Sequence, residues 1–149
     1  MAPEFSISKP APGVLAARLA GSGILALGGA PLRELTRHVG RSDRLELFLD
    51  AAALEGTSVE QSDAWALWFA RHRARLKQVH LLPGAKFVHL TPEFLRRFAD
   101  SNGVLRIYVE RAAYDAALAA SVLQARRRVI AILDWMGRTQ PGGAARASS

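Results

Sequence analysis

Apolar residues recur along the chain at two spacings, which predict alternating strands and helices. Short apolar runs predict five strands, at residues 5–8, 14–19, 45–49, 78–82 and 104–109. Apolar positions three and four residues apart predict four helices, at residues 32–39, 59–77, 91–102 and 112–136, the last with a break near 126–128. The order predicts an α/β fold with a mostly parallel sheet of four or five strands and an antiparallel hairpin at the start.

The run at residues 45–49 is apolar on both faces except for Glu46, which predicts a central strand covered by helices. It leads through a short connection into a helix whose first turn offers the hydroxyls of Thr57 and Ser58. Helix N-termini leave N–H groups unpaired and carry partial positive charge, and α/β sheets often bind ligands at such places. This turn is therefore the first candidate site.

Composition narrows the class of protein. Half of the 149 residues are apolar, which suits one domain, and the absence of Cys excludes disulfides, zinc–thiolate sites and thiol catalysis. We find no signal-like N-terminus and no apolar run of bilayer length, which predicts a cytoplasmic protein without membrane insertion. The net charge is +7, but 17 of the 20 bases are Arg, as in proteins from GC-rich genomes, so nucleic acid is not the expected partner.

The sequence does not place its candidate catalytic residues together as a catalytic site. Asp50 and Glu55 flank the connection after the central strand and would suit acid–base work, but no nucleophile or His accompanies them. A strand-end carboxylate that accepts loop N–H groups is the simpler interpretation of Asp50. The four His residues lack metal-ligand spacing. We therefore expect no enzyme activity, no cofactor and no metal.

Two interpretations of Thr57 and Ser58 stay open. Ser58 with Gln61, or Thr57 with Glu60, has the spacing of a capping box, in which a hydroxyl accepts a hydrogen bond from an N–H one turn later. Alternatively, one hydroxyl accepts a phosphoryl group or contacts a partner. The helix dipole would favour a phosphate there, whereas Glu55 and Glu60 would oppose it.

Several segments together resemble the STAS domain family, the fold of bacterial anti-sigma-factor antagonists, and in particular its SpoIIAA-like branch. The resemblance covers residues 13 to about 118. Its carriers are Gly13-Val14-Leu15, Leu47-Phe48-Leu49-Asp50, Leu54-Glu55-Gly56-Thr57-Ser58, His80-Leu81-Leu82 and the segment Thr91-Pro92-Glu93-Phe94-Leu95-Arg96-Arg97-Phe98.

The resemblance implies a non-enzymatic regulatory module that binds other proteins. In phosphorylatable members the turn reads Asp-Ser-Ser-Gly, and one Ser is phosphorylated by a partner kinase. Here Glu55 or Gly56 stands where Asp is usual and Val59 where Gly is usual, which suits the SpoIIAA-like branch and its lack of an established switch. The partner-binding or phosphoacceptor residues implied are Ser58, Thr57, Asp50, Glu55 and Gly56.

The predicted organisation is an N-terminal arm at 1–12, a STAS-like domain at 13–118, a helical extension at 119–137 and a disordered tail at 138–149. The last helix carries an apolar stripe longer than the sheet needs, which predicts a homodimer about a two-fold axis with Arg126, Arg127 and Arg128 at its rim. The alternative function is a small-molecule or lipid-binding carrier. Its pocket would be lined by Trp65, Trp68, Phe69, Phe87 and Phe94.

Overall fold

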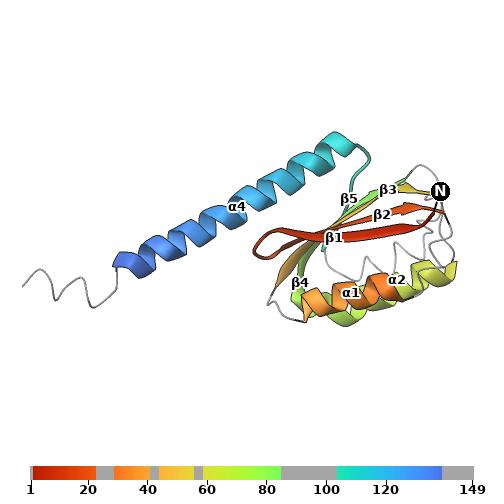
Figure 1. Cartoon of the computed structure of the whole chain (residues 1–149), viewed down its shortest axis with the longest axis horizontal. Coiled ribbons are helices and arrows are strands. Elements are labelled where there is room, and N and C mark those ends of the chain that lie inside the picture. The colour runs from red at the N-terminus through yellow and green to blue at the C-terminus, as the bar shows by residue number, and fades with distance from the viewer. Residues whose placement is uncertain (1, 23–28, 41–43, 56–58, 85–103, 139–149) are drawn as a thin grey trace, which may run out of the picture.

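The computed structural model describes residues 2–22, 29–40, 44–55, 59–84 and 104–138. Its elements are β1 (Glu4–Ala11), β2 (Val14–Gly21), α1 (Ala30–Val39), β3 (Leu45–Leu54), α2 (Val59–His72), the 3-10 helix η2 (Arg73–Arg75), β4 (Leu76–Pro83), β5 (Leu105–Ile107) and α4 (Arg111–Arg138). The predicted α/β class is confirmed (Figure 1). None of the described helices has the length and apolar character that crossing a membrane would require.

The five strands form one mixed sheet in the order β1-β2-β3-β4-β5. β1 and β2 are antiparallel, as predicted, and the remaining neighbours are parallel. The hairpin turns at Pro12 and Gly13, and Gly13 has φ +78°, the left-handed conformation that a type II turn requires after a proline. β3 lies in the middle of the sheet and is buried on both faces, which confirms the prediction for residues 45–49.

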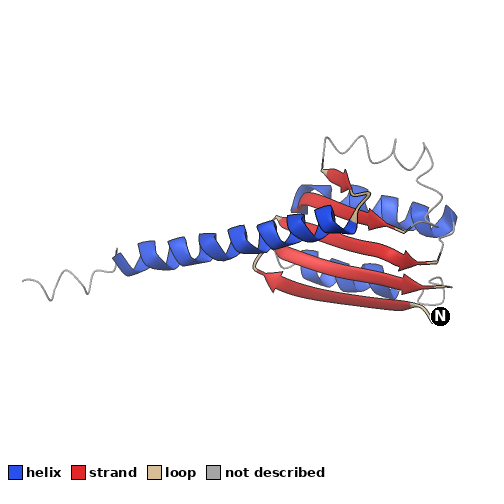
Figure 2. Cartoon of the chain, turned by 90° about the horizontal axis from the view of Figure 1, so that it is seen from above, coloured by secondary structure: helices blue, strands red, loops and turns tan. Residues whose placement is uncertain are grey.

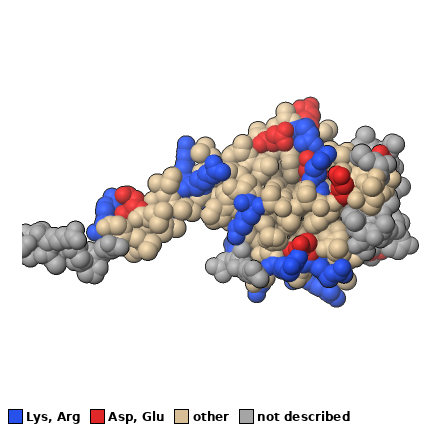
Figure 3. Space-filling model, viewed as in Figure 1, with Lys and Arg blue, Asp and Glu red and all other residues tan. Residues whose placement is uncertain are grey.

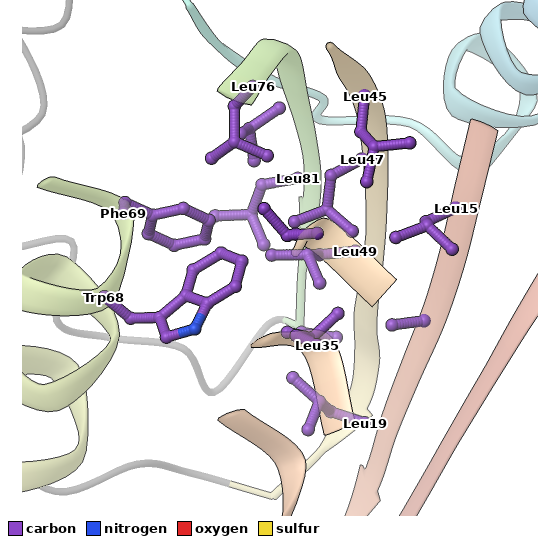
Figure 4. Packing of buried hydrophobic residues seen from close by; sticks show 14 of the residues in the cluster. Leu15, Leu19, Leu35, Leu45, Leu47, Leu49, Trp68, Phe69, Leu76 and Leu81 are labelled. Carbon is purple, nitrogen blue, oxygen red and sulfur yellow. The ribbon is translucent and has the colours of Figure 1, made fainter. Parts of the chain in front are cut away.

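Helices α1 and α2 cover one face of the sheet (Figures 1 and 2). Alternate strand residues point into this layer, and the aromatic rings of α2 meet them there (Figure 4). Its larger members are Leu15, Leu19, Leu35, Leu45, Leu47, Leu49, Trp68, Phe69, Leu76 and Leu81. The indole N–H of Trp68 donates to Thr36 Oγ1 at 2.9 Å, so that α1 and α2 are joined by a polar contact as well as by packing.

Helix α4 lies on the opposite face and extends past the β1–β2 turn (Figures 1 and 2). Its first half contributes Tyr114 to a second apolar cluster, in which it packs with Phe48 and Leu82 of the sheet. The break expected near residues 126–128 is wrong, because α4 runs uninterrupted from Arg111 to Arg138. Arginine favours helices, and the three consecutive arginines therefore do not interrupt this one.

Helix α2 ends at His72, so the prediction of a helix reaching residue 77 is wrong. A 3-10 turn follows, and Leu76 already pairs with Leu45 as the first residue of β4. Leu76 continues the helical spacing of His72 and Phe69, but strand pairing decides its conformation. Strand β5 is shorter than the expected 104–109. The helix expected at 91–102 lies outside the described residues, as does the tail expected at 138–149 except for Arg138, which is the last residue of α4.

Candidate functional site

Asp50, the first of the predicted site residues, is held by two partners on the α4 side of the sheet. Its carboxylate accepts the backbone N–H of Ala52 at 3.1 Å. Nη2 of Arg111, at the start of α4, donates to Oδ1 at 3.1 Å and to Oδ2 at 2.9 Å. These bonds and the Asp50 charge raise the pKa of the Arg111 guanidinium above its ordinary value. We expected Asp50 at the end of its strand with a loop N–H as its partner, but β3 continues to Leu54, so Ala52 is itself a strand residue. Arg111 is a partner that the sequence did not reveal.

Of the other predicted site residues, the structure describes only Glu55. Glu55 is exposed, and its backbone N–H donates to the carbonyl of Gly21 at 2.9 Å, which extends the contact between β2 and β3. Gly56, Thr57 and Ser58 lie outside the described residues. Because α2 begins at Val59, the helix start expected near Ser58 is confirmed. Asp50 and Glu55 have separate surroundings, one bonded to Arg111 and the other exposed beyond the strand.

A buried polar network lies beneath the first half of α4. Its central residue is His80 of β4, whose ring is only 2% exposed. His80 Nε2 lies 2.7 Å from Glu46 Oε1 on β3, and His80 Nδ1 lies 2.7 Å from the Tyr108 hydroxyl just after β5. The Ser121 hydroxyl of α4 donates to the same Glu46 oxygen at 2.8 Å. We call these four residues the Glu46–His80 clamp, because they connect β3, β4 and the residue that follows β5 to α4.

One proton arrangement satisfies the whole clamp. A neutral His80 donates a hydrogen bond from Nε2 to the Glu46 carboxylate and accepts one from the Tyr108 hydroxyl at Nδ1. Ser121 also donates to Glu46. Burial lowers the pKa of His80 below its ordinary 6.5, although the hydrogen bond and charge of Glu46 act in the opposite direction. The nearby Arg106 also lowers the pKa of His80. The neutral ring is thus the form that the fold prefers.

Aromatic rings enclose the clamp on its apolar side. Phe48 stacks on His80 with centroids 4.0 Å apart and an interplanar angle of 1°. Tyr114 of α4 meets Phe48 edge-on at 5.8 Å and meets Tyr108 edge-on at the same distance. Burial raises the pKa of the Tyr114 hydroxyl far above its ordinary 10.0, so it stays protonated. The rings exclude water and thereby strengthen the hydrogen bonds of the clamp.

The clamp connects α4 to the sheet through the hydrogen bond between Ser121 and Glu46. Ser121 hydrogen bonds to Glu46 and not to His80, so the order of groups differs from that of a nucleophile activated by a histidine. Both His80 nitrogens are engaged within the protein. Among the described residues, no three His, Asp or Glu side chains gather as a metal site. The clamp fixes where α4 lies on the sheet.

Sequence reasoning missed the clamp, although part of its signal was present. Glu46 is the single polar residue within a run that is otherwise apolar, and His80 is likewise set among apolar residues of the neighbouring strand. A buried polar side chain requires a partner. Both residues lie on the same face of the sheet, but Ser121 is 75 positions from Glu46, and no local pattern connects them.

The second half of α4 extends beyond the sheet and carries large exposed apolar side chains. Ala125 is still buried against the domain, and Arg126 donates to the carbonyl of Pro10 at 3.4 Å. Beyond this point Ile130 is 66% exposed, and several more apolar residues are at least half exposed: Ile132, Leu133, Trp135 and Met136. We call residues 126–138 the projecting segment.

The aromatic residues proposed as a pocket lining lie in the core in so far as they are described. Trp68 and Phe69 are buried in the α1–α2 layer, and Trp65 packs against it. Their rings contact one another, with Trp68 and Phe69 centroids 5.3 Å apart. These three side chains fill space between α2 and the sheet. Phe87 and Phe94 lie outside the described residues.

Comparison with known proteins adds no assignment to this geometry. No protein-family model, curated protein or solved structure matches the chain.

Proposed function

We propose that this chain is a non-enzymatic regulatory module of STAS type that binds another protein. The order of its elements supports this, because an antiparallel hairpin followed by parallel strands and helices suits the resemblance over residues 13–118. The clamp also supports it, since Glu46, bonded to the buried His80, holds Ser121 of α4 while the second half of that helix stays exposed.

The projecting segment is the observation that carries the proposal. Single exposed apolar residues are normal on protein surfaces, but contiguous groups of them mark interaction sites. Here exposed apolar residues succeed one another along the part of α4 that extends beyond the sheet (Figure 1). A helix with such a surface is a common docking element for an apolar groove or for another helix.

The turn before α2 is the second contact that we propose, through Asp50, Glu55, Gly56, Thr57 and Ser58. Ser58 there acts either as a helix cap or as a phosphoacceptor. The two roles differ in outcome: Ser58→Asp keeps a cap and would preserve partner binding, whereas it would abolish binding if a phosphoryl group on Ser58 switches the module off. The cytoplasm is the proposed compartment.

The partner in this proposal is either a second copy of the chain or a different protein. A second copy would give the predicted homodimer, with α4 paired about a two-fold axis. Light scattering on the full-length protein at tens of micromolar separates dimer from monomer. Ile132→Gln removes an exposed apolar group of the projecting segment and would convert such a dimer to a monomer.

Photo-cross-linking tests the proposal directly. A photoreactive phenylalanine analogue replaces Ile132 in the full-length protein, and Arg127, on the other side of the same helix, is replaced in the control. In extracts of the source organism we expect a discrete protein adduct, or a cross-linked dimer, from position 132 and not from position 127. A chain that is monomeric and gives no adduct specific to position 132 would rule the proposal out.

A further inference from the structure

We infer that the partner of the projecting segment is an amphipathic helix of a different protein, with acidic residues beside its apolar stripe. This inference rests on the proposed function and names the chemistry of its partner. It follows from the spacing of the apolar residues on α4, from the charges beside them and from the shape of the domain next to them.

Apolar residues on α4 follow a coiled-coil spacing. Leu118, Val122, Ala125, Val129, Ile132 and Met136 succeed one another at intervals of four, three, four, three and four residues. Leu118, Val122 and Ala125 pack on the sheet, so the docked half of the stripe is already covered. Val129, Ile132 and Met136 continue it in the same register beyond the sheet, where Ile132 is 57% exposed. This spacing is the one by which a helix pairs with another helix.

Charge beside the stripe favours an acidic partner. In heptad terms Val122 and Val129 occupy a positions, so Arg126 is at e and Arg128 at g, the two positions that face a paired helix. The projecting segment holds four arginines and one acid, Asp134, a net charge of +3. Figure 3 shows basic side chains at two places along this helix, with surface free of charged residues between them.

The projecting segment of a second copy has no acidic residue that would pair with Arg126 or Arg128. Asp134 lies two residues from both Ile132 and Met136, which places it on the opposite side of the helix from the stripe. Its carboxylate is already paired with Arg138 at 2.8 Å. Two copies joined along the stripe would bring two segments of charge +3 together without compensation. A partner with Glu or Asp at its own e and g positions would instead form ion pairs with Arg126 and Arg128.

The shape of the domain disfavours a flat partner such as a lipid surface. The stripe lies on the side of α4 that faces the sheet, because its first half packs on the sheet. A bilayer that touched Val129 and Ile132 would have to extend into the space of the β1–β2 hairpin, past which the helix projects (Figure 1). A single helix is narrow enough to lie along the projecting segment beside that hairpin.

The test uses full-length protein and two fluorescein-labelled helical peptides of 21 residues, with Leu at a and d. One peptide carries Glu at e and g, and the other carries Lys there. Fluorescence anisotropy, with peptide at nanomolar concentration, measures each affinity. We expect at least tenfold tighter binding of the Glu peptide at 50 mM NaCl and a smaller preference at 500 mM, because salt screens exposed charges.

Matched variants locate the contact. Ile132→Gln should weaken binding of the Glu peptide at least tenfold, while Ala131→Gln, one position away from the stripe, should leave it unchanged. Arg128→Glu should remove the preference for the Glu peptide, and Arg127→Glu, which makes the same charge change at an outer position, should alter it far less. Circular dichroism checks that each variant melts like the parent protein.

Three results would overturn the inference. Equal binding of the two peptides, or no binding of the Glu peptide at 100 µM protein, would show that the partner is not an acidic helix. A dimer that Ile132→Gln converts to a monomer identifies a second copy as the occupant; the proposed function then stands and only the inference fails. Co-sedimentation with phosphatidylglycerol vesicles that Ile132→Gln abolishes, without peptide binding, makes the occupant a lipid surface and overturns both proposals.

Discussion

Replacing Glu46 by alanine removes the acceptor shared by His80 and Ser121 and tests whether the clamp stabilises the fold. The loss leaves the Nε2–H of His80 without its partner in a site that is 2% exposed. A buried donor without an acceptor costs about 1–3 kcal/mol, and hydrogen bonds to a charged group lie at the upper end. The Ser121 hydroxyl is only partly buried and regains water, so it adds little. We expect Glu46→Ala to lower the free energy of unfolding by about 2–3 kcal/mol.

Glu46→Gln refines this test, because it keeps an acceptor oxygen and loses the charge. Charge-assisted hydrogen bonds are roughly twice as strong as neutral ones, so this variant should lose about 1 kcal/mol. Urea unfolding followed by tryptophan fluorescence measures both variants. Glu34→Gln removes an exposed ion pair with Arg37 on α1 and is the matched control, expected within about 0.5 kcal/mol of the parent. A Glu46→Ala protein as stable as this control would show that the clamp contributes nothing.

Three further predictions concern His80, Thr36 and Ser58. Because burial lowers the pKa of His80, the unfolded chain binds more protons just below pH 6.5, and stability should fall as the pH falls through that region; His80→Gln should flatten this part of the urea-midpoint profile. Thr36→Val leaves the indole N–H of Trp68 without its acceptor and should cost about 1–2 kcal/mol in thermal or urea unfolding, whereas an unchanged stability would exclude a structural role for that bond. Ser58→Ala should lower stability by about 1 kcal/mol if Ser58 caps α2, and Ser58→Asp should then be tolerated in both unfolding and cross-linking assays.

Local pattern was sufficient for most of the fold. The two-sided apolar run at residues 45–49 predicted a central strand, and the Pro12-Gly13 turn between two apolar runs predicted the hairpin. These features depend on residues close in sequence. The end of α2 could not be predicted from nearby residues. Leu76 suits either a helix or a strand, and its pairing with Leu45 of β3 decides between them.

The candidate site was less predictable, because its contacts join distant parts of the chain. Asp50 was expected at the end of a strand, but β3 continues to Leu54, and the partner of Asp50, Arg111, is 61 residues away. Glu46 and His80 were visible as polar residues within apolar strands, yet their meeting depends on the parallel register of β3 and β4. Periodicity indicated an apolar stripe on the last helix through Leu118, Val122 and Val129, but placed Ile130 and Leu133 on it and not Ile132 or Met136. Where the helix leaves the sheet depends on the length of the strands beneath it.

The unbroken course of α4 gives the domain a stiff arm. Its 28 residues span about 42 Å, and about 25 Å of this lies between Ser121 in the clamp and the end of the helix. Over that distance a tilt of about 10° at the clamp would displace the far end by about 4 Å, which is roughly three quarters of a helical turn. The Ser121–Glu46 hydrogen bond therefore acts together with the packing of Tyr114 and the Arg111–Asp50 pair to set the direction in which the arm points, and with it the orientation of whatever the arm holds.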